Sequence, residues 1–194
     1  MDDPRLIALK QSLETRPITA AERDGHTREA AVALLLRPRE QLELLLIKRA
    51  THDTDPWSGH MAFPGGRRDQ GDMDLQITAA RETAEEVGIT LREDDYIGAL
   101  DEVAPLTRRL PPILIAPFVF GVPTTAATAI SPNEVEAAVW VPLSALRDEN
   151  AASEILIEME SEAHAFPSFK YGEYVIWGLT HRILAQFLEL TRGL

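Results

Sequence analysis

Apolar and polar positions along the chain divide it into many short strands and a few helices. Apolar residues recur at helical spacing over residues 4–16, from about 74 to 87 and from about 174 to 190, which predicts three helices. Short apolar or alternating runs predict strands at residues 30–36, 42–47, 60–63, 96–100, 113–122, 135–141 and 155–159. Strands outnumber helices and do not alternate regularly with them. The pattern therefore predicts an α/β (α+β) fold, a mixed sheet with flanking helices.

Turn-forming residues indicate how some of these strands connect. Residues 37–41 form a polar link between two strands, which predicts a hairpin. Pro117 has no backbone N–H to donate, so the strand around it is expected at a sheet edge or at a bulge. The pair Gly65 and Gly66 follows a short strand, and such a pair marks a place where the backbone turns sharply or approaches another group closely.

The helix predicted from about 74 to 87 carries an acidic face. Its apolar stripe comprises Ile77, Ala80, Ala84 and Val87, and its opposite side carries Glu82, Glu85 and Glu86. In an acidic protein such a face is often only solvated. Like charges one turn apart repel, however, so a cluster that points into a cleft either raises its own pKa values or holds a cation. Carboxylates without His or Cys favour Mg²⁺ or Mn²⁺ over Zn²⁺.

Other side chains support the helix itself. Asp72 or Asp74 could cap its first turn by accepting a hydrogen bond from a free backbone N–H. Arg81 precedes Glu85 by one turn, a spacing at which the two side chains can form an ion pair. Gly88 stands where a left-handed residue would end the helix.

Composition narrows the class of protein. The 194 residues include 31 Asp plus Glu, 19 Lys plus Arg, no Cys and 45% hydrophobic residues, which predicts a single domain over residues 1–194 with a substantial core. A formal charge of −12 argues against nucleic acid and anionic membranes as partners. The absence of Cys excludes disulfides, thiolate nucleophiles and Cys-ligated metals. Without a secretory signal or an apolar run that could span a bilayer, the protein is expected to be cytoplasmic.

Residues 66–89 resemble the Nudix box, whose usual form is G-x5-E-x7-R-E-U-x-E-E-x-G-U, with U a bulky aliphatic residue. The matching residues are Gly66, Arg81, Glu82, Glu85, Glu86, Gly88 and Ile89. Two positions depart from the pattern: Asp72 replaces the first Glu, with one extra residue before Arg81, and Thr83 stands at the first U. The resemblance implies a Nudix hydrolase fold, an α/β/α sandwich around a mixed sheet.

The resemblance also implies roles for these residues. Mg²⁺ or Mn²⁺ would be held by Glu82, Glu85, Glu86 and the carbonyl of Gly66. Such ions would neutralise a diphosphate and lower the pKa of a bridging water. Arg81 would hold the glutamates in place. The general base could be one of the helix glutamates or Glu134, and Glu134 could equally be a helix cap or a surface residue.

Residues near the box are candidates for substrate binding. They are Arg49, Gly65, Gly66 and Arg67. Arginine suits phosphate recognition because its planar fork of donors matches phosphate oxygens. Arg67 and its neighbour Arg68 could equally be solvated loop charges. Packing in the core or at an interface accounts for Trp57 and Trp177 without a ligand.

The flanking segments 45–50 and 59–66 resemble the coenzyme A (CoA) diphosphatase branch of this family. That branch reads L-L-T-x-R-[SA]-x3-R-x3-G-x3-F-P-G-G. Here its second Arg is replaced by Thr54 or Asp55, and Arg49 lies one residue further from Gly59. The resemblance implies hydrolysis of CoA or its derivatives to 3′,5′-ADP and 4′-phosphopantetheine. A neutral or acidic residue in place of that Arg would weaken CoA binding.

Two other functions stay open. A Nudix pyrophosphatase could act on ADP-ribose, dinucleotides or nucleoside triphosphates. A Nudix-fold regulator could bind a nucleotide without turnover, although the intact set of Glu82, Glu85 and Glu86 argues against a pure binder. In each case the partner is a small nucleoside diphosphate derivative. The C-terminal helix could pack on its own sheet or on a second subunit, which would give a homodimer.

Overall fold

The structure is a computed structural model, and it describes residues 2–23, 26–51, 57–105, 112–159 and 162–193. Its helices are α1 (Pro4–Glu14), α2 (Leu75–Val87), α3 (Leu143–Arg147) and α4 (Gly178–Leu190), with short 3-10 turns η1 (Glu93–Asp95) and η2 (Glu149–Ala151). Its strands are β1 (Arg28–Pro38), β2 (Leu42–Arg49), β3 (Met61–Ala62), β4 (Gly65–Arg67), β5 (Tyr96–Ala99), β6 (Ile113–Gly121), β7 (Val135–Pro142), β8 (Ala152–Met159), β9 (Glu162–Tyr171) and β10 (Tyr174–Trp177).

The main sheet is mixed, as the sequence predicts. Among the described residues it has seven strands in the order β3-β2-β1-β6-β5, with β4 paired to β1 and β7 paired to β2. The long central pair β1 and β6 is parallel, and the other pairs are antiparallel. Successive side chains of each strand leave opposite faces, so the sheet has two faces to cover.

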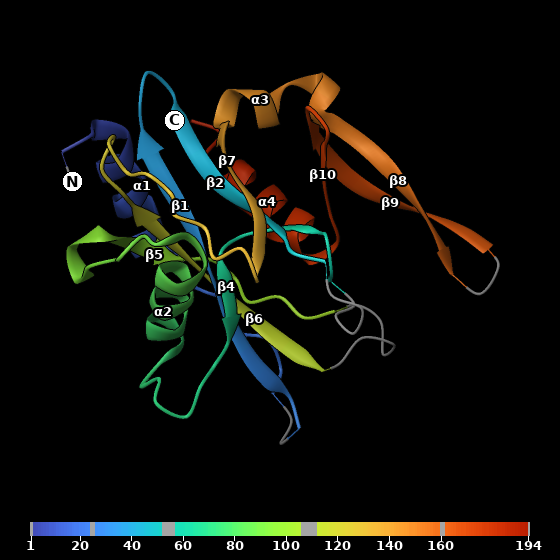
Figure 1. The fold of residues 1–194 in the computed structure, drawn as a ribbon. Helices are drawn as coiled ribbons and strands as arrows, with labels where there is room; N and C mark the ends of the chain where they lie inside the picture. Colours follow the sequence, from blue (N-terminus) through green and yellow to red (C-terminus); the bar gives the residue numbers. More distant parts are fainter. Residues whose placement is uncertain (1, 24–25, 52–56, 106–111, 160–161, 194) are drawn as a thin grey trace.

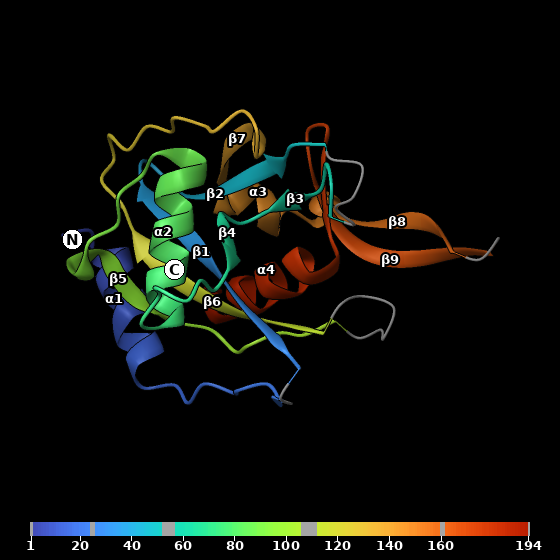
Figure 2. The same ribbon diagram turned by 60° about the horizontal axis from the view of Figure 1, so that its bottom comes forward.

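Helices cover both faces of this sheet (Figure 1). On one face, α1 and α4 contribute Leu9 and Phe187 to a large apolar core that includes Leu34 of β1. On the other face, Ala79 of α2 packs against Ala33 of β1 in a second, smaller core. Figure 2 shows α2 and α4 on opposite sides of the strands. The fold is thus the α/β/α sandwich expected from the Nudix resemblance.

The predicted hairpin exists, but its two strands pair only near the turn. The register joins Leu36, Arg37 and Pro38 to Leu44, Glu43 and Leu42. Further from the turn β1 pairs with β4 instead of β2, while β2 pairs with β7 over residues 43–49 and with β3 near its end. The two strands therefore separate, and β4 takes the place of β2 beside β1.

The expectation for Pro117 is wrong in one respect, because this residue lies in an interior strand. It pairs with Val32 in the parallel ladder between β1 and β6. On the other side of β6 the regular ladder with β5 ends at the pair Ala99 and Phe118. The missing N–H of Pro117 thus falls just beyond the end of that ladder, where it leaves no regular pair incomplete.

A second sheet has the order β10-β9-β8, and its strands β8 and β9 form an arm that projects from the body (Figure 2). The sequence predicts only part of it: the predicted strand 155–159 begins earlier, at Ala152, and β9 is not predicted. The predicted helix from about 174 to 190 is wrong at its start, because Tyr174–Trp177 is strand β10 and the helix begins at Gly178. In the parts of the chain that are described, no helix is both long and apolar enough to cross a membrane.

Candidate active site

Helix α2 begins and ends at the predicted residues. Asp74 is the N-cap, and its carboxylate accepts a hydrogen bond from the backbone N–H of Ile77 at 2.8 Å. Gly88 ends the helix with a φ of 69°, in the left-handed region. Of the two candidate caps, Asp74 therefore does this work, and Asp72 is available for another contact.

The buried face of α2 is not the predicted one. Its buried residues are Thr78, Ala79, Thr83, Glu86 and Val87, whereas Ile77 is 37% exposed and Ala84 is exposed. The small side chains of alanine and threonine let the helix lie close to β1 and β4. The expectation that all three glutamates lie opposite the packed face is therefore wrong: Glu86 is buried and Glu82 is partly buried.

Glu86 is a buried carboxylate held by strand β4. It is only 4% exposed, and its Oε2 accepts a hydrogen bond from the backbone N–H of Gly65 at 2.8 Å. Burial raises its pKa to about 7, and the negative charges of Glu82 and Glu134 act in the same direction. The Gly65 N–H and the charge of Arg49 oppose this rise but do not cancel it.

Glu82 lies directly against the backbone of Gly66. A Cβ built on Gly66 would come within 2.4 Å of the Glu82 Cδ, so only glycine leaves room for this carboxylate. Burial raises the pKa of Glu82, and the neighbouring Arg81 partly offsets that rise. Gly65 is needed for another reason, because its φ is 155° and a Cβ there would meet the carbonyl oxygen of Ala31 at 2.2 Å.

Arg81 connects the carboxylates of the site. Its Nη1 lies 2.9 Å from Glu82 Oε1 and donates to Glu85 Oε2 at 2.9 Å, which confirms the predicted pair with Glu85. Its Nη2 donates to Asp72 Oδ2 and to the carbonyl of Arg67, both at 3.0 Å. One guanidinium thus joins the helix to strand β4 and to the loop between them. Glu85 stays on the outer side, with its side chain 53% exposed.

Asp72 holds the guanidinium of Arg81 in place through hydrogen bonds to its two carboxylate oxygens. It is buried, and besides Arg81 it accepts hydrogen bonds from the backbone N–H of Asp69 at 3.0 Å and from the Thr78 hydroxyl at 2.9 Å. The Arg81 guanidinium, followed by these two donors, holds the pKa of Asp72 well below its usual range. The shorter Asp and the extra residue in the box therefore still deliver a carboxylate to Arg81. The sequence alone does not point to Thr78, because a threonine in a helix gives no signal of such a contact.

Glu134 and Arg49 face the same cluster from neighbouring strands. Glu134 immediately precedes β7, its carbonyl accepts a hydrogen bond from the N–H of Ala50 at 2.8 Å, and its charge raises the pKa of Glu82 and of Glu86. Since β7 and not a helix begins here, the helix-cap alternative for Glu134 is wrong. Arg49 ends β2, and its charge acts on Glu86.

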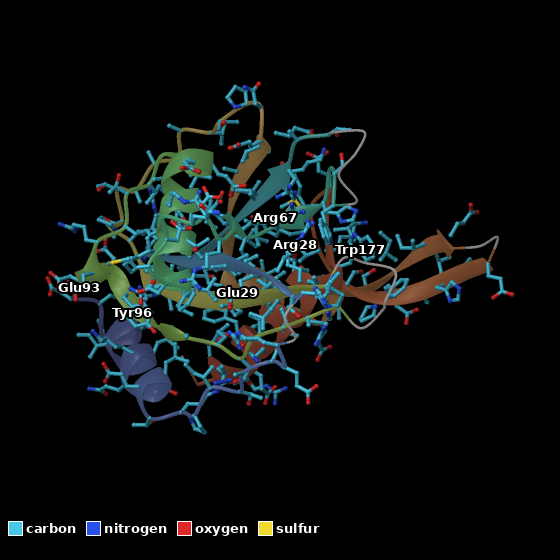
Figure 3. All side chains as sticks on the ribbon, turned by 90° about the horizontal axis from the view of Figure 1, so that it is seen from below. Arg28, Glu29, Arg67, Glu93, Tyr96 and Trp177 are labelled. Atoms are coloured by element: carbon cyan, nitrogen blue, oxygen red, sulfur yellow. The ribbon has the colours of Figure 1, made fainter. Side chains whose placement is uncertain are left out.

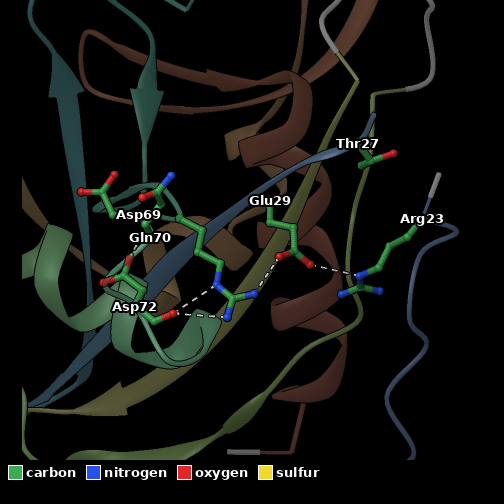
Figure 4. Close-up of a pocket in the computed structure, with 7 residues that line it drawn as sticks. Arg23, Thr27, Glu29, Asp69, Gln70 and Asp72 are labelled. Atoms are coloured by element: carbon green, nitrogen blue, oxygen red, sulfur yellow. Dashed lines mark hydrogen bonds and ion pairs between the residues drawn. The ribbon is translucent and has the colours of Figure 1, made fainter. Parts of the chain in front are cut away.

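Arg67 and Arg68 have different positions. Arg68 donates to Glu29 Oε2 at 2.9 Å and to the carbonyls of Asp72 and Met73, so it closes the loop before α2. Glu29 also pairs with Arg23, and this network lines an open pocket of about 510 Å³ (Figure 4). Arg67 follows Gly66 in β4, so its side chain leaves the sheet on the face opposite to Gly66.

The remaining sequence candidates lie outside this cluster. Trp177 has its ring centroid 4.8 Å from that of His60 and 5.8 Å from that of Phe166, which agrees with a packing role. Thr54 and Asp55, which replace the second Arg of the CoA branch, lie outside the described residues.

The donor set fits a hard divalent cation such as Mg²⁺ or Mn²⁺. Within the described ranges no three Asp, Glu or His side chains already converge as a complete metal site. Glu82 and Glu86 nevertheless supply carboxylate oxygens at one place, and burial and the negative charges of neighbouring glutamates raise the pKa values of both. A nearby positive charge favours the ionised form of a carboxyl group, and carboxylate oxygens are preferred ligands of these ions.

Comparison with known proteins assigns the chain to a family. The family model of the NUDIX domain matches residues 26–159. The uncharacterized Nudix hydrolase NudL of Enterobacter sp. (strain 638) is 34% identical over 159 residues, which cover 82% of this chain and 80% of that protein. The uncharacterized protein C14C4.10c of Schizosaccharomyces pombe is 45% identical over 107 residues, or 53% of this chain and 32% of that protein. The chain thus spans about a third of the latter relative.

Solved structures agree with the fold. The crystal structure of a MutT/nudix family protein from Enterococcus faecalis covers 96% of this chain and 70% of that chain, with a TM-score of 0.63 at 16% identity. At this identity the likeness shows the fold alone. The NUDIX match and the similarity to NudL show that the chain belongs to the Nudix family and is a Nudix pyrophosphohydrolase.

Proposed function

We propose that this Nudix pyrophosphohydrolase cleaves the diphosphate of CoA or its derivatives, giving 3′,5′-ADP and 4′-phosphopantetheine. The general chemistry rests on one observation: Arg81 and the glycine pair hold Glu82 and Glu86 as a partly buried carboxylate pair beside strand β4. The choice of CoA rests on the flanking segments 45–50 and 59–66, which resemble the CoA diphosphatase branch.

The residues that would hold a divalent cation are Glu82, Glu85, Glu86 and the carbonyl of Gly66. Held there, Mg²⁺ or Mn²⁺ would neutralise the diphosphate and make water a better nucleophile. Glu85 would have to exchange its contact with Arg81 for this role, because the two side chains are paired at 2.9 Å. Arg49, at the end of β2 and close enough to act on Glu86, would bind a phosphate oxygen.

The chain offers two candidates for the general base. In the metal-free protein the carboxyl of Glu86 has a pKa of about 7, so there it can accept and release a proton at neutral pH. Glu134 is exposed and its charge acts on the same cluster. Arg81 is a positioning residue in this scheme, since it contacts the carboxylates and not the substrate. A cytoplasmic location and a homodimer stay predictions of the sequence.

A substrate profile tests the proposal. We expect purified enzyme with Mg²⁺ or Mn²⁺ to show its highest kcat/KM on CoA or an acyl-CoA, compared with ADP-ribose, dinucleotides and nucleoside triphosphates. Mass spectrometry should identify 3′,5′-ADP and 4′-phosphopantetheine as products. A higher kcat/KM on ADP-ribose, a dinucleotide or a triphosphate would assign the chain to that substrate class instead, and binding of nucleotides without turnover would indicate a regulator.

A further inference from the structure

Two arginines lie close together on the face of the main sheet that is opposite to helix α2. Arg67 of β4 pairs with Ala30 of β1, and Arg28 lies two residues before Ala30. Because side chains alternate along a strand, Arg28, Ala30 and Arg67 leave the same face. Both arginines are exposed, and Figure 3 labels them next to each other near the middle of the view.

These two positive charges differ from those of the neighbouring arginines in the described part of the chain. Within the described ranges neither side chain takes part in a hydrogen bond or an ion pair, whereas nearby Arg23 and Arg68 share Glu29. Like charges on neighbouring strands repel, which makes the arrangement mildly destabilising by itself. The chain has 31 acidic residues against 19 basic ones, so acidic side chains that could pair with these arginines are abundant in its sequence. The geometry therefore favours an anionic ligand at this place.

The pair lies next to the carboxylate cluster but across the sheet from it. Arg67 directly follows Gly66, whose backbone contacts Glu82, and the Arg67 carbonyl accepts a hydrogen bond from Arg81. Among the described residues β4 pairs only with β1, and at its other edge the Gly65 N–H donates to Glu86 and the Arg67 carbonyl accepts from Arg81. A ligand whose diphosphate lies at these carboxylates is therefore separated from the arginines by this one strand.

We propose that Arg28 and Arg67 bind a phosphate monoester that the substrate carries on its ribose, separate from the diphosphate. In CoA this group is the 3′-phosphate, so the inference rests on the proposed function. Two guanidinium groups can give a phosphate dianion several charge-assisted hydrogen bonds. Dephospho-CoA and ADP-ribose lack this phosphate monoester. Arg28 and Arg67 would therefore determine specificity by favouring CoA over these two compounds.

Kinetics on CoA and dephospho-CoA test this role. We expect the wild-type enzyme to prefer CoA by about 10- to 100-fold in kcat/KM, which is the range for losing hydrogen bonds to a charged group. Arg28→Ala and Arg67→Ala should each reduce kcat/KM for CoA and leave that for dephospho-CoA within about twofold. Arg67→Lys should recover part of the preference, because it restores the charge but not the paired donors. Lys170→Ala removes an exposed charge from β9 and should change neither value.

A binding measurement separates failure of this inference from failure of the proposed function. Calorimetric titration with 3′,5′-ADP and with AMP requires no turnover, and the wild type should bind 3′,5′-ADP more tightly, with the difference lost in Arg28→Ala. If CoA is hydrolysed but no better than dephospho-CoA, the inference is wrong and the proposed function stands. If CoA is not hydrolysed but 3′,5′-ADP binds more tightly through these arginines, the proposed function is wrong and the phosphate site stands. Equal binding of both nucleotides contradicts the phosphate site.

Discussion

At the scale of single residues, burial distinguishes the three glutamates of α2. Glu86 lies under β4, Glu82 lies against Gly66, and Glu85 reaches out to Arg81 from the solvent side. Their sequence spacing gives no sign of these differences. As a consequence, the ionised form of Glu86 is disfavoured, because its charge is both removed from water and repelled by neighbouring carboxylates.

Replacement of this carboxylate should separate catalysis from folding. We expect Glu86→Gln to lower the Mg²⁺-dependent kcat by at least ~100-fold, because the amide keeps an acceptor for the Gly65 N–H but loses the charge. The control Glu93→Gln changes an exposed acid of η1 and should leave kcat unchanged. Turnover like that of the wild type in Glu86→Gln would contradict the assignment of Glu86.

The same variant has a defined pH signature in metal-free protein. The folded-state pKa of Glu86 is raised from 4.5 to about 7, so its ionisation lowers the free energy of unfolding progressively as the pH rises from about 4.5 through 7. Glu86→Gln removes that loss. Thermal unfolding in EDTA should therefore give the variant a higher Tm than the wild type at pH 8 and a similar one at pH 4.

Part of the site could be predicted from sequence and part could not. The cap at Asp74, the end at Gly88 and the Arg81 contact with Glu85 follow from local spacing, which is the same in any helix. Which face of α2 packs on the sheet is set by its contacts with β4 and does not follow from local spacing. Apolar Ile77 suggests one buried face, but only the small residues Ala79 and Thr83 allow α2 to come close enough to bury Glu86.

At the scale of elements, strand β4 carries more of the site than its three residues suggest. Its Gly65 N–H donates a hydrogen bond to Glu86, and its Arg67 carbonyl accepts one from Arg81. Glu82 lies against the backbone of its Gly66. Its two glycines meet different obstacles. At Gly65 the obstacle is the backbone of β1, which cannot move without breaking the sheet, and at Gly66 it is the end of a flexible side chain.

These obstacles predict different outcomes for two matched substitutions. Gly65→Ala should destabilise the fold strongly, lowering the Tm by several degrees, because the new methyl group clashes with Ala31 and the residue has a φ of 155°. Gly66→Ala should keep the Tm near the wild-type value but displace Glu82 and reduce kcat by about 10-fold or more. Circular dichroism melting curves and Mg²⁺-dependent kinetics measure both effects. Loss of folding in Gly66→Ala alone would contradict this distinction.

The elements that the sequence missed share physical causes. Strand β9 carries mostly exposed residues and includes Pro167, so it lacks both the apolar alternation and the composition of a strand. Strand β10 has four residues and leads directly into α4, so the apolar positions of the strand and the helix together predict one continuous helix. Helix α3 has five residues, too few for a helical period to appear.

At the scale of the whole molecule, the arm of β8 and β9 stands apart from the rest. The main sheet has apolar cores on both faces, whereas most of the described residues of the arm are exposed, and Leu156 is 69% exposed. Stability is therefore expected to be unevenly distributed, with the outer arm opening more easily than the sheet.

Shortening the arm should leave the sandwich intact. Ile155 and Phe166 face each other in the ladder, so residues 156–165 can be replaced by Asn-Gly, which closes a two-residue hairpin. We expect the Tm to change by no more than about 2 °C, because few core contacts are lost. The matched control inserts Asn-Gly after residue 158 without any deletion. A drop in Tm of more than about 5 °C in the shortened protein would show that the outer arm belongs to the cooperative unit.

The pairing of β1 has a consequence for the order in which the protein is made. This central strand pairs with β2 only at residues 36–38, and its main partner, β6, is synthesised after α2 and β5. On the ribosome, the apolar run from Ala31 to Leu36 therefore waits without its longest neighbour while a large part of the chain emerges. We therefore expect the arrival of β6, and not closure of the early hairpin, to commit the nascent chain to its native sheet.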